Sequence, residues 1–234
     1  MNIIFQELGI KNVMLNIKSF SVIDKDAVKG NIHVVGVGAL GSQIVERLIR
    51  LNLASKIIIY DMDIVEEKNL NNQAYLYKHI GMTKVEAMQD LSLNIDPDVK
   101  LRGKVKQVEY LRTKSEDIVI LAIDNFQARG KILEQIEGNP LVISGGISSI
   151  GGNFETVRGT KHYKTLSKEY LSLESGLEYD ENDLTPCGSP ISIYHRIGFA
   201  ASLICDAVIK YHSDIEDINF NTVFDTPNLT ILKY

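Results

Sequence analysis

Three glycines follow a short apolar run in this chain, and their spacing is typical of a phosphate-binding turn. The segment reads Gly36-Val37-Gly38-Ala39-Leu40-Gly41. The first glycine of such a turn permits the tight bend, the second lets the backbone approach a phosphate, and the third lets the next helix pack on the sheet. The start of that helix adds N–H donors and a partial positive charge. We therefore predict that these residues bind the phosphates of a nucleotide.

An acidic residue stands where a nucleotide's ribose would lie. Asp61 ends the second apolar run, residues 56–60. In nucleotide-binding α/β folds, a carboxylate at the end of the second strand binds ribose hydroxyls. The alternative is that the glycines only make a tight connection and that Asp61 only caps a loop. Turn, helix and acid occur together, which favours the nucleotide site. Taken alone, this pattern also fits an NAD-dependent oxidoreductase.

A second group of polar residues indicates ATP instead of a dinucleotide. It lies in the segments DMDIVEEKNLNNQ (61–73), GMTKVEA (81–87) and AIDNFQAR (122–129). A triphosphate needs cations and amide donors for its oxygens and a carboxylate for Mg2+, whereas a dehydrogenase needs no such aspartate. Each residue also has a simpler interpretation. Lys84 could be a solvated helix charge, Asp124 a helix N-cap, and Arg129 the partner of a nearby carboxylate.

These three segments resemble the ThiF/MoeB/HesA family, the bacterial relatives of ubiquitin-activating enzymes. The similarity extends from about residue 20 to the C-terminal hairpin. The resemblance implies ATP and Mg2+ as cofactors and a homodimer as the assembly. It also implies an adenylyltransferase, which activates the C-terminal carboxylate of a small ubiquitin-like or sulfur-carrier protein or of a peptide. Pyrophosphate leaves, and the mixed anhydride then passes to a sulfur, thiol or amine.

The resemblance also implies roles for individual residues. Asp61 resembles the ribose-binding aspartate, Lys84 the lysine that neutralises phosphate charge, and Asp124 the Mg2+ ligand. The expected catalytic residues are Lys84, Asp124, Asn69, Arg129 and Cys187. The expected nucleotide-binding residues are Gly36, Gly38, Ala39, Leu40, Gly41, Asp61, Asp63, Asn72, Gln73, Lys84 and Asp124. The chemistry asks mainly for positioning and electrostatic stabilisation, because the carboxylate is already the nucleophile.

The sequence departs from the family pattern NLNRQ at Asn72, which stands in place of an arginine on the phosphates. Asparagine brings no charge, and losing a charge-assisted contact typically costs a few kcal/mol. The family often takes a further arginine from the partner's N-terminal segment, but the only cations of residues 1–46 are Lys11, Lys18, Lys25 and Lys29. Either a lysine substitutes, or Arg47, Arg50 or another group does, or catalysis is weak. A catalytically degenerate nucleotide-binding regulator or scaffold is therefore an alternative function.

The two cysteines, Cys187 and Cys205, exclude a disulfide framework and a zinc site made of two CxxC pairs. We expect no structural zinc. Cys187 precedes a predicted helix, and a thiol near a helix N-terminus has a lowered pKa. Some relatives carry a cysteine there that forms a thioester or persulfide, although a small packing residue is the alternative. Cys205 is expected in the core.

The elements that must position these residues follow from hydrophobic periodicity. Strands are predicted over 31–35, 56–60, 99–108, 117–123 and 141–144, alternating with helices over 39–53, 81–95 and 126–137. This order indicates an α/β, Rossmann-like, mostly parallel sheet with helices on both faces. Next we expect a strand over 153–159, an irregular flap over 160–187 that binds the carrier's tail, a helix over 190–212 and an antiparallel hairpin over 218–232.

Length and composition place these elements in one domain. The chain has 234 residues, and 44% of them are hydrophobic. We expect an N-terminal arm (1–28), a nucleotide-binding half (29–150) and a carrier-binding half (151–234). A net charge of −5 gives no case for nucleic acid or an anionic membrane as the main partner. No apolar run reaches the roughly 18 residues of a membrane span, and no signal peptide is visible, so we expect a cytoplasmic protein.

Overall fold

A computed structural model describes residues 30–54, 56–148, 151–173, 193–212, 220–228 and 230–233. The strands are β1 (Ile32–Val35), β2 (Ile57–Asp61), β3 (Leu101–Val105), β4 (Leu111–Arg112), β5 (Ile118–Leu121), β6 (Ile136–Glu137), β7 (Leu141–Ile147), β8 (Gly151–Val157), β9 (Phe220–Asp225) and β10 (Thr230–Lys233). The α-helices are α2 (Ala39–Leu51), α3 (Lys84–Ile95), α4 (Phe126–Glu134), α5 (Thr160–Ser172) and α6 (Tyr194–His212). Two short 3-10 helices, η2 (Glu67–Asn71) and η3 (Tyr77–His79), lie between β2 and α3.

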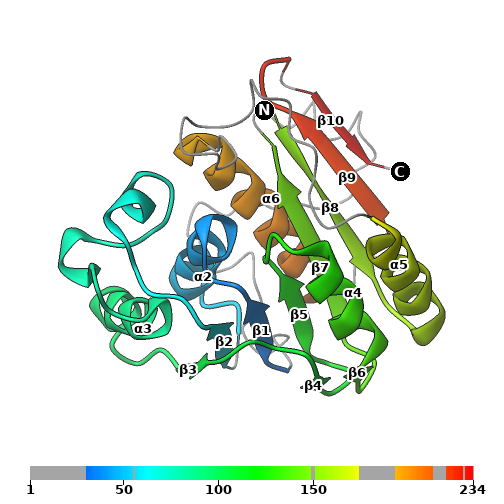
Figure 1. Cartoon of the computed structure of the whole chain (residues 1–234), viewed down its shortest axis with the longest axis horizontal. Helices are drawn as coiled ribbons and strands as arrows, with labels where there is room; N and C mark the ends of the chain where they lie inside the picture. The colour runs from blue at the N-terminus through cyan, green and yellow to red at the C-terminus, as the bar shows by residue number, and fades with distance from the viewer. Residues whose placement is uncertain are drawn as a thin grey trace, which may run out of the picture.

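One eight-stranded sheet in the order β10-β9-β8-β7-β5-β1-β2-β3 organises the molecule (Figure 1). The strands from β3 to β7 in this order run parallel, and β8, β9 and β10 are antiparallel additions. The chain leaves β1 for β2 on one side and later returns to β5 on the other. Open parallel sheets bind ligands at such a reversal, beyond the carboxyl ends of the strands. The turn after β1 lies at this point.

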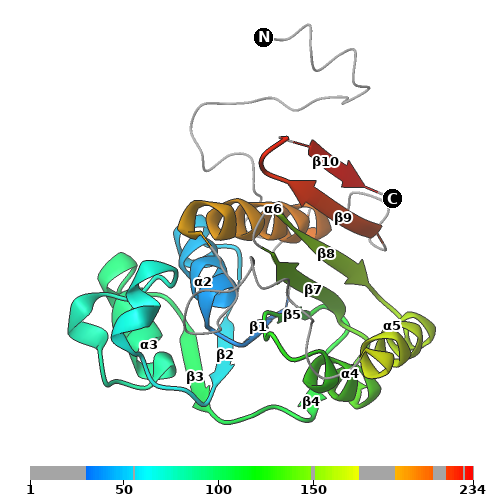
Figure 2. The ribbon, with the colours of Figure 1, turned by 45° about the horizontal axis from the view of Figure 1, so that its top comes forward.

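Two apolar cores cover the two faces of the sheet. Helices α2, α3 and α6 pack on one face through residues such as Ile44, Met88 and Ile204, all almost fully buried. Helices α4 and α5 pack side by side on the other face, which Figure 2 shows from a second angle. Side chains alternate between faces along a strand, so Val34 joins the first core and Val35 the second. The predicted fold class is confirmed.

The flap predicted over 160–187 is wrong for the part that the structure describes. Residues 160–172 form α5, and the rest of the predicted flap from residue 174 lies outside the described residues, as does the arm 1–28. Tyr163, Leu166 and Tyr170 recur at three- and four-residue spacing and are buried against α4 and the sheet. Two of these three buried residues are tyrosines with charged neighbours in the sequence. The helical spacing of apolar residues was therefore not recognised. No helix in the described residues has the length and apolar character needed to cross a membrane.

Candidate nucleotide-binding site

The glycine turn connects β1 to α2, and its three glycines meet different surroundings. Gly36 has a φ of +86°, and a Cβ atom there would lie 2.8 Å from the main-chain oxygen of Ala122. A Cβ on Gly41 would lie 1.9 Å from the oxygen of Gly36. A Cβ on Gly38, by contrast, would meet nothing within 4 Å. The outer glycines are therefore required by packing, while the middle one leaves open space beside the backbone.

The N-terminus of α2 opens onto this space. Gly38 is its N-cap residue, no side chain caps the helix, and no acidic residue lies in the first turn. The first N–H groups of a helix have no partner within the helix, and they attract anions. The start of α2 can therefore bind phosphate oxygens, and the space beside Gly38 fits the group that the sequence predicted.

Asp61 closes the other side of the turn. Its Oδ2 accepts a hydrogen bond of 2.8 Å from the main-chain N–H of Val37, and its Oδ1 accepts one of 2.9 Å from that of Asp63. Each carboxylate oxygen can accept a second hydrogen bond. Asp61 thus shapes the turn and keeps the acceptor capacity that ribose hydroxyls need.

Lys84 is held beside Asp63 by contacts that cross the loop between β2 and α3. Its Nζ lies 2.7 Å from Oδ2 of Asp63, and its main-chain N–H donates to the oxygen of Asp63 at 2.9 Å. The lysine is only 8% exposed. Thr83 caps α3 and exchanges hydrogen bonds with Glu86, which fixes the helix start that carries the lysine. Lys84 is therefore a positioned cation instead of a solvated helix charge.

The polar segment after η2 is anchored to α2. Ala74 donates its main-chain N–H to Ser42 Oγ at 3.0 Å, and Gln43 donates to the main-chain oxygen of Asn72 at 3.4 Å. Gln73 is 8% exposed, and its Oε1 has no hydrogen-bond partner among the described residues. Asn69 accepts from the N–H of Glu66 at 2.8 Å and so stabilises η2. Asn72 thus lies against α2, Gln73 is buried next to it, and Asn69 stays within η2.

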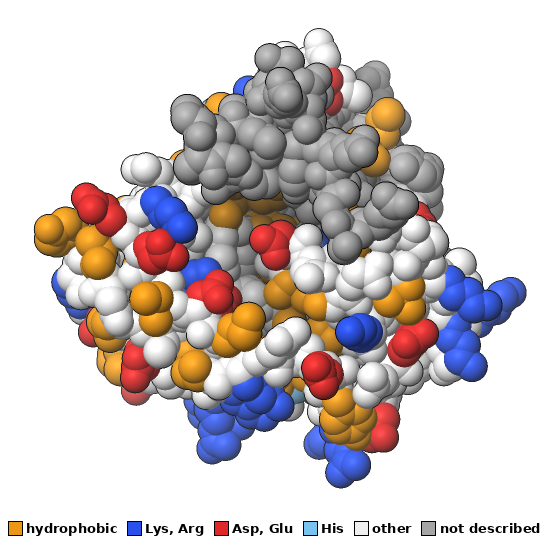
Figure 3. Space-filling view, viewed as in Figure 1, with side chains coloured by type: hydrophobic (Ala, Val, Ile, Leu, Met, Phe, Trp, Pro, Cys, Tyr) orange, Lys and Arg blue, Asp and Glu red, His pale blue; other side chains and the backbone are white. Residues whose placement is uncertain are grey.

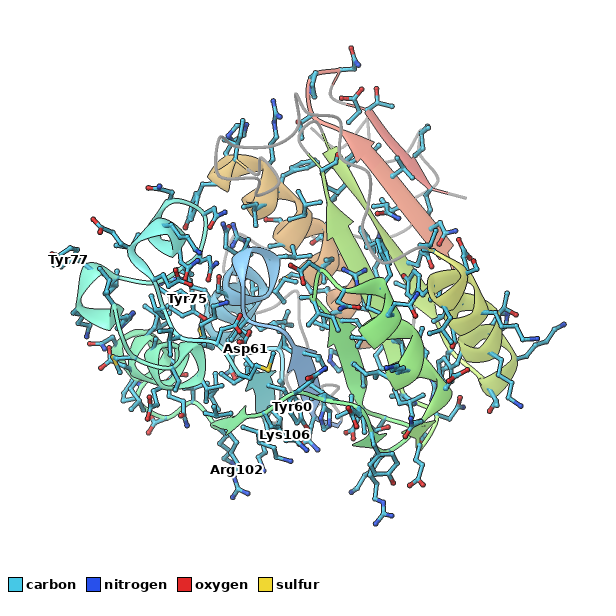
Figure 4. The ribbon with its side chains drawn as sticks, in the orientation of Figure 1. Tyr60, Asp61, Tyr75, Tyr77, Arg102 and Lys106 are labelled. Carbon is cyan, nitrogen blue, oxygen red and sulfur yellow. The ribbon has the colours of Figure 1, made fainter. Side chains whose placement is uncertain are left out.

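Tyr75 belongs to this site, and the sequence reasoning missed it. Its hydroxyl donates to the main-chain oxygen of Val37 at 2.6 Å and lies 3.4 Å from that of Lys84. Burial and the nearby carboxylates of Asp61 and Asp63 raise its pKa far above the usual range, so the phenol keeps its proton. Figure 4 shows Tyr75 and Asp61 on the side of the molecule where α2 begins. In the sequence, the only indication of this role was that Tyr75 is an aromatic residue next to a polar segment.

Asp124 and Arg129 follow β5 but have different surroundings. Asp124 is exposed, and the neighbouring Asn125, not Asp124, caps α4 by accepting from Ala128 N–H at 2.9 Å. Its carboxylate is thus available, and Mg2+ bound with a nucleotide often uses only one or two carboxylates besides phosphates. Arg129 is 4% exposed. The described residues contain no group of three or more His, Cys, Asp or Glu placed to hold a metal ion by themselves.

The guanidinium of Arg129 bonds to the residues that follow β5 and to the middle of β7. It donates to the main-chain oxygen of Ile123, to that of Gly145 at 2.7 Å and to Ser144 Oγ at 3.1 Å. Burial lowers its pKa. These bonds connect the residues after β5 to β7, so Arg129 holds the segment next to Asp124 in place.

Several predicted residues do not meet at this site. Arg47 bonds to Gln43 and to Ser202 of α6, while Arg50 pairs with Glu46. Both lie in the second half of α2, Arg47 about 12 Å along the helix from its start. Cys205 lies in the core as expected, where burial raises the pKa of its thiol to about 12. Cys187 and the lysines of the N-terminal segment, Lys11, Lys18, Lys25 and Lys29, lie outside the described residues.

The space-filling view shows a hollow near the centre of this face, with acidic and apolar side chains at its rim (Figure 3). The described contacts connect the start of α2, Asp61 and Lys84 through Asp63 and Tyr75. The residues just before Asp124, Ala122 and Ile123, lie against Gly36 of the turn. Such a set can bind a nucleotide's phosphates and ribose and neutralise charge that develops on a phosphate.

Comparison with known proteins identifies the family and the fold. The ThiF family pattern matches residues 14–232. A ubiquitin-like modifier-activating enzyme 5 from Drosophila mojavensis is 31% identical over 214 residues, which are 83% of this chain and 52% of the relative. Crystal structures of E. coli MccB, one with ATP and one with SeMet MccA, have TM-scores of 0.65 and 0.68 at 15% identity, covering 90% of this chain and 65% of theirs. The chain spans about half the length of the curated relative.

Proposed function

This chain belongs to the ThiF family, and from that premise we propose that it is an ATP-dependent adenylyltransferase. Its substrate is the C-terminal carboxylate of a small ubiquitin-like or sulfur-carrier protein or of a peptide. The observation that carries the proposal is the convergence of the open space at Gly38, the uncapped start of α2 and the Lys84–Asp63 pair. The names of the similar proteins, activating enzymes and a structure with ATP, support it.

The proposed reaction forms one bond and breaks one bond at the α-phosphorus of ATP. A carboxylate oxygen of the substrate attacks, and the bond to the bridging oxygen of pyrophosphate breaks. The products are an acyl adenylate and pyrophosphate. Negative charge grows on the phosphate oxygens, and Lys84 with the N–H groups of α2 stabilises it. Asp61 binds the ribose, and Asp63 holds Lys84 in position.

A magnesium ion, where bound with ATP, would supply charge neutralisation on the phosphates, and Asp124 is the residue that would hold it. Asn69 of η2 and the two residues that follow η2, Asn72 and Gln73, would hydrogen-bond to the nucleotide. We propose a homodimer as the working assembly and the half from 151 to 234 as the carrier's contact.

The direct test is exchange of labelled pyrophosphate into ATP. Candidate carriers are small proteins that end in Gly-Gly and peptides encoded beside this gene. We expect exchange with one of them, and a loss of about 100-fold in Lys84→Ala, the size typical for removing a group that stabilises transition-state charge. Asp124→Ala should reduce the rate of exchange by a similar factor.

Lys78→Ala is the matched control, because Lys78 also pairs with an aspartate, Asp90, but is exposed. Full exchange by Lys84→Ala would refute the role of the lysine.

Asn72 favours a second candidate, a nucleotide-binding regulator or scaffold without catalysis. The residue brings no charge, and its segment is anchored to α2 through Gln43. ATP binding measured by calorimetry, together with no pyrophosphate exchange for any carrier, would support this alternative. A gain of exchange in Asn72→Arg would show that only the missing cation limits the reaction.

A further inference from the structure

Within the described residues, strand β3 ends the sheet and has a strand neighbour only on its β2 side. Ile57 donates to the main-chain oxygen of Lys100, and Lys106 donates to that of Asp61. In a parallel pair, alternate residues bond to the neighbour and the others turn their N–H and C=O groups the opposite way. The backbone groups of Leu101, Gly103 and Val105 therefore point to the open edge.

A row of four cations follows this edge. Lys100, Arg102, Lys104 and Lys106 alternate along the strand, so their side chains lie on one face. All four are exposed, and none forms an ion pair with another described residue. The whole chain has a net charge of −5. The row is thus a local positive surface on an acidic protein, visible as the Lys and Arg side chains gathered below β2 and β3 in Figure 3.

Among the described residues, α3 packs against Gly103 of β3, and no helix follows β3 to cover the face that carries the cations. The connection from β3 to β5, residues 106–117, is described throughout and contains only the short strand β4. Tyr60 of β2 is 3% exposed, and Nζ of Lys104 lies 5.2 Å from the centre of its ring. A cation over an aromatic ring is attracted to it. Figure 4 shows Arg102 and Lys106 next to Tyr60 at this margin.

We propose that β3 binds an extended acidic segment of a partner protein, which joins the sheet as an additional strand. Directly opposite residues on adjacent strands have Cβ atoms about 4.5–5.5 Å apart. Aspartate or glutamate at every second position of the segment would therefore face the four cations. The open backbone groups of β3 give the bound segment its hydrogen bonds, and the cations select its charge pattern. The same cations repel another copy of β3, so this edge does not pair with itself.

The first test compares two labelled peptides on the full chain. One has glutamate at every second position between valines and threonines, and the other has the same composition with its glutamates in one block. Fluorescence anisotropy at low salt should show the alternating peptide binding at least 10-fold more tightly. Its affinity should fall as salt screens the charges. Equal affinity of the two peptides would overturn the proposal, because only the strand pairing distinguishes them.

Charge variants locate the site on the protein. Arg102→Glu combined with Lys106→Glu should weaken the alternating peptide at least 10-fold. Lys164→Glu combined with Lys168→Glu, on exposed positions of α5, makes the same change in net charge and should leave binding unchanged. Equal losses in both double variants would show that only overall charge matters and would refute the site.

Backbone pairing is tested on the peptide, so that the protein stays unaltered. N-methyl groups on one alternate set of peptide residues remove the donors that face β3, while the other set faces solvent. One methylated peptide should lose binding and the other should keep it. If both keep it, no strand is added. Tighter binding of a single-stranded DNA of equal charge than of the alternating peptide would identify a general polyanion surface and overturn the proposal.

Discussion

The hydroxyl of Tyr75 donates a hydrogen bond of 2.6 Å to the main-chain oxygen of Val37, in the middle of the glycine turn. The same hydroxyl lies 3.4 Å from the main-chain oxygen of Lys84. One buried phenol therefore connects the turn to the first residue of α3. The backbone of the glycine turn and the lysine cannot shift independently while this connection holds.

Tyr75→Phe should weaken ATP binding without unfolding the protein. The ring still fills its place, but the buried oxygen of Val37 loses its donor, which costs about 1–3 kcal/mol. We expect a lower melting temperature and a several-fold higher Kd for ATP with Mg2+ by calorimetry. Tyr163→Phe is the control, because this buried hydroxyl donates to the main-chain oxygen of Pro140 in the core against α4. Unchanged ATP affinity in both variants would show that the hydrogen bond of the Tyr75 hydroxyl does not position the glycine turn or Lys84 for ATP.

Alanine at two glycines should separate binding from folding. At Gly38 (φ −73°) an added Cβ meets nothing within 4 Å, so Gly38→Ala should keep the melting temperature and lose ATP affinity by filling the space. At Gly41 the added Cβ would lie 1.9 Å from the oxygen of Gly36, so Gly41→Ala should lower the melting temperature by several degrees. Calorimetry and thermal unfolding measure the two effects. Normal ATP binding by Gly38→Ala would argue against phosphate at this position.

Glu155 should give the stability a pH dependence. Burial, with a smaller effect from Glu169, raises the pKa of its carboxyl from 4.5 to about 7, while Arg129 opposes the shift. The folded state therefore holds this proton more tightly than the unfolded state, and the stability from that proton is lost as pH rises from 4.5 to 7. Glutamine at position 155 cannot titrate. The melting temperature of Glu155→Gln should therefore rise relative to that of the wild type as the pH increases from 4.5 to 7. Glu134→Gln, exposed on α4, is the control. Parallel melting curves for Glu155→Gln and wild type would contradict the shift.

The choice between ATP and a nicotinamide cofactor is open to a simple measurement. A ligand that binds only the folded state raises the melting temperature in proportion to its affinity and concentration. We expect a shift with ATP and Mg2+ and none with NADH at equal concentration, because Lys84 and Asp124 suit a triphosphate with its metal ion. The reverse result would revive the oxidoreductase interpretation.

Hydrophobic period and glycine spacing were enough to predict most of the fold. The run from Asn31 to Val35, the glycine turn and the helix after it are local patterns, and the structure contains them close to their predicted bounds. The period failed at α5, where few positions are apolar and two of the buried contacts are tyrosines. A local pattern identifies an element only when the buried residues stand out from their neighbours.

Taken by itself, the sequence determined most of the element types, the glycine turn and the identities of the charged residues, because these depend on nearby residues. Only the tertiary structure decided how those residues meet. It paired Lys84 with Asp63, brought Tyr75 to Val37 and buried Arg129 against the end of β5. Such contacts depend on the order of the strands in the sheet and on loops that fold back over α2. Residues far apart in the chain meet through that arrangement, which no local period encodes.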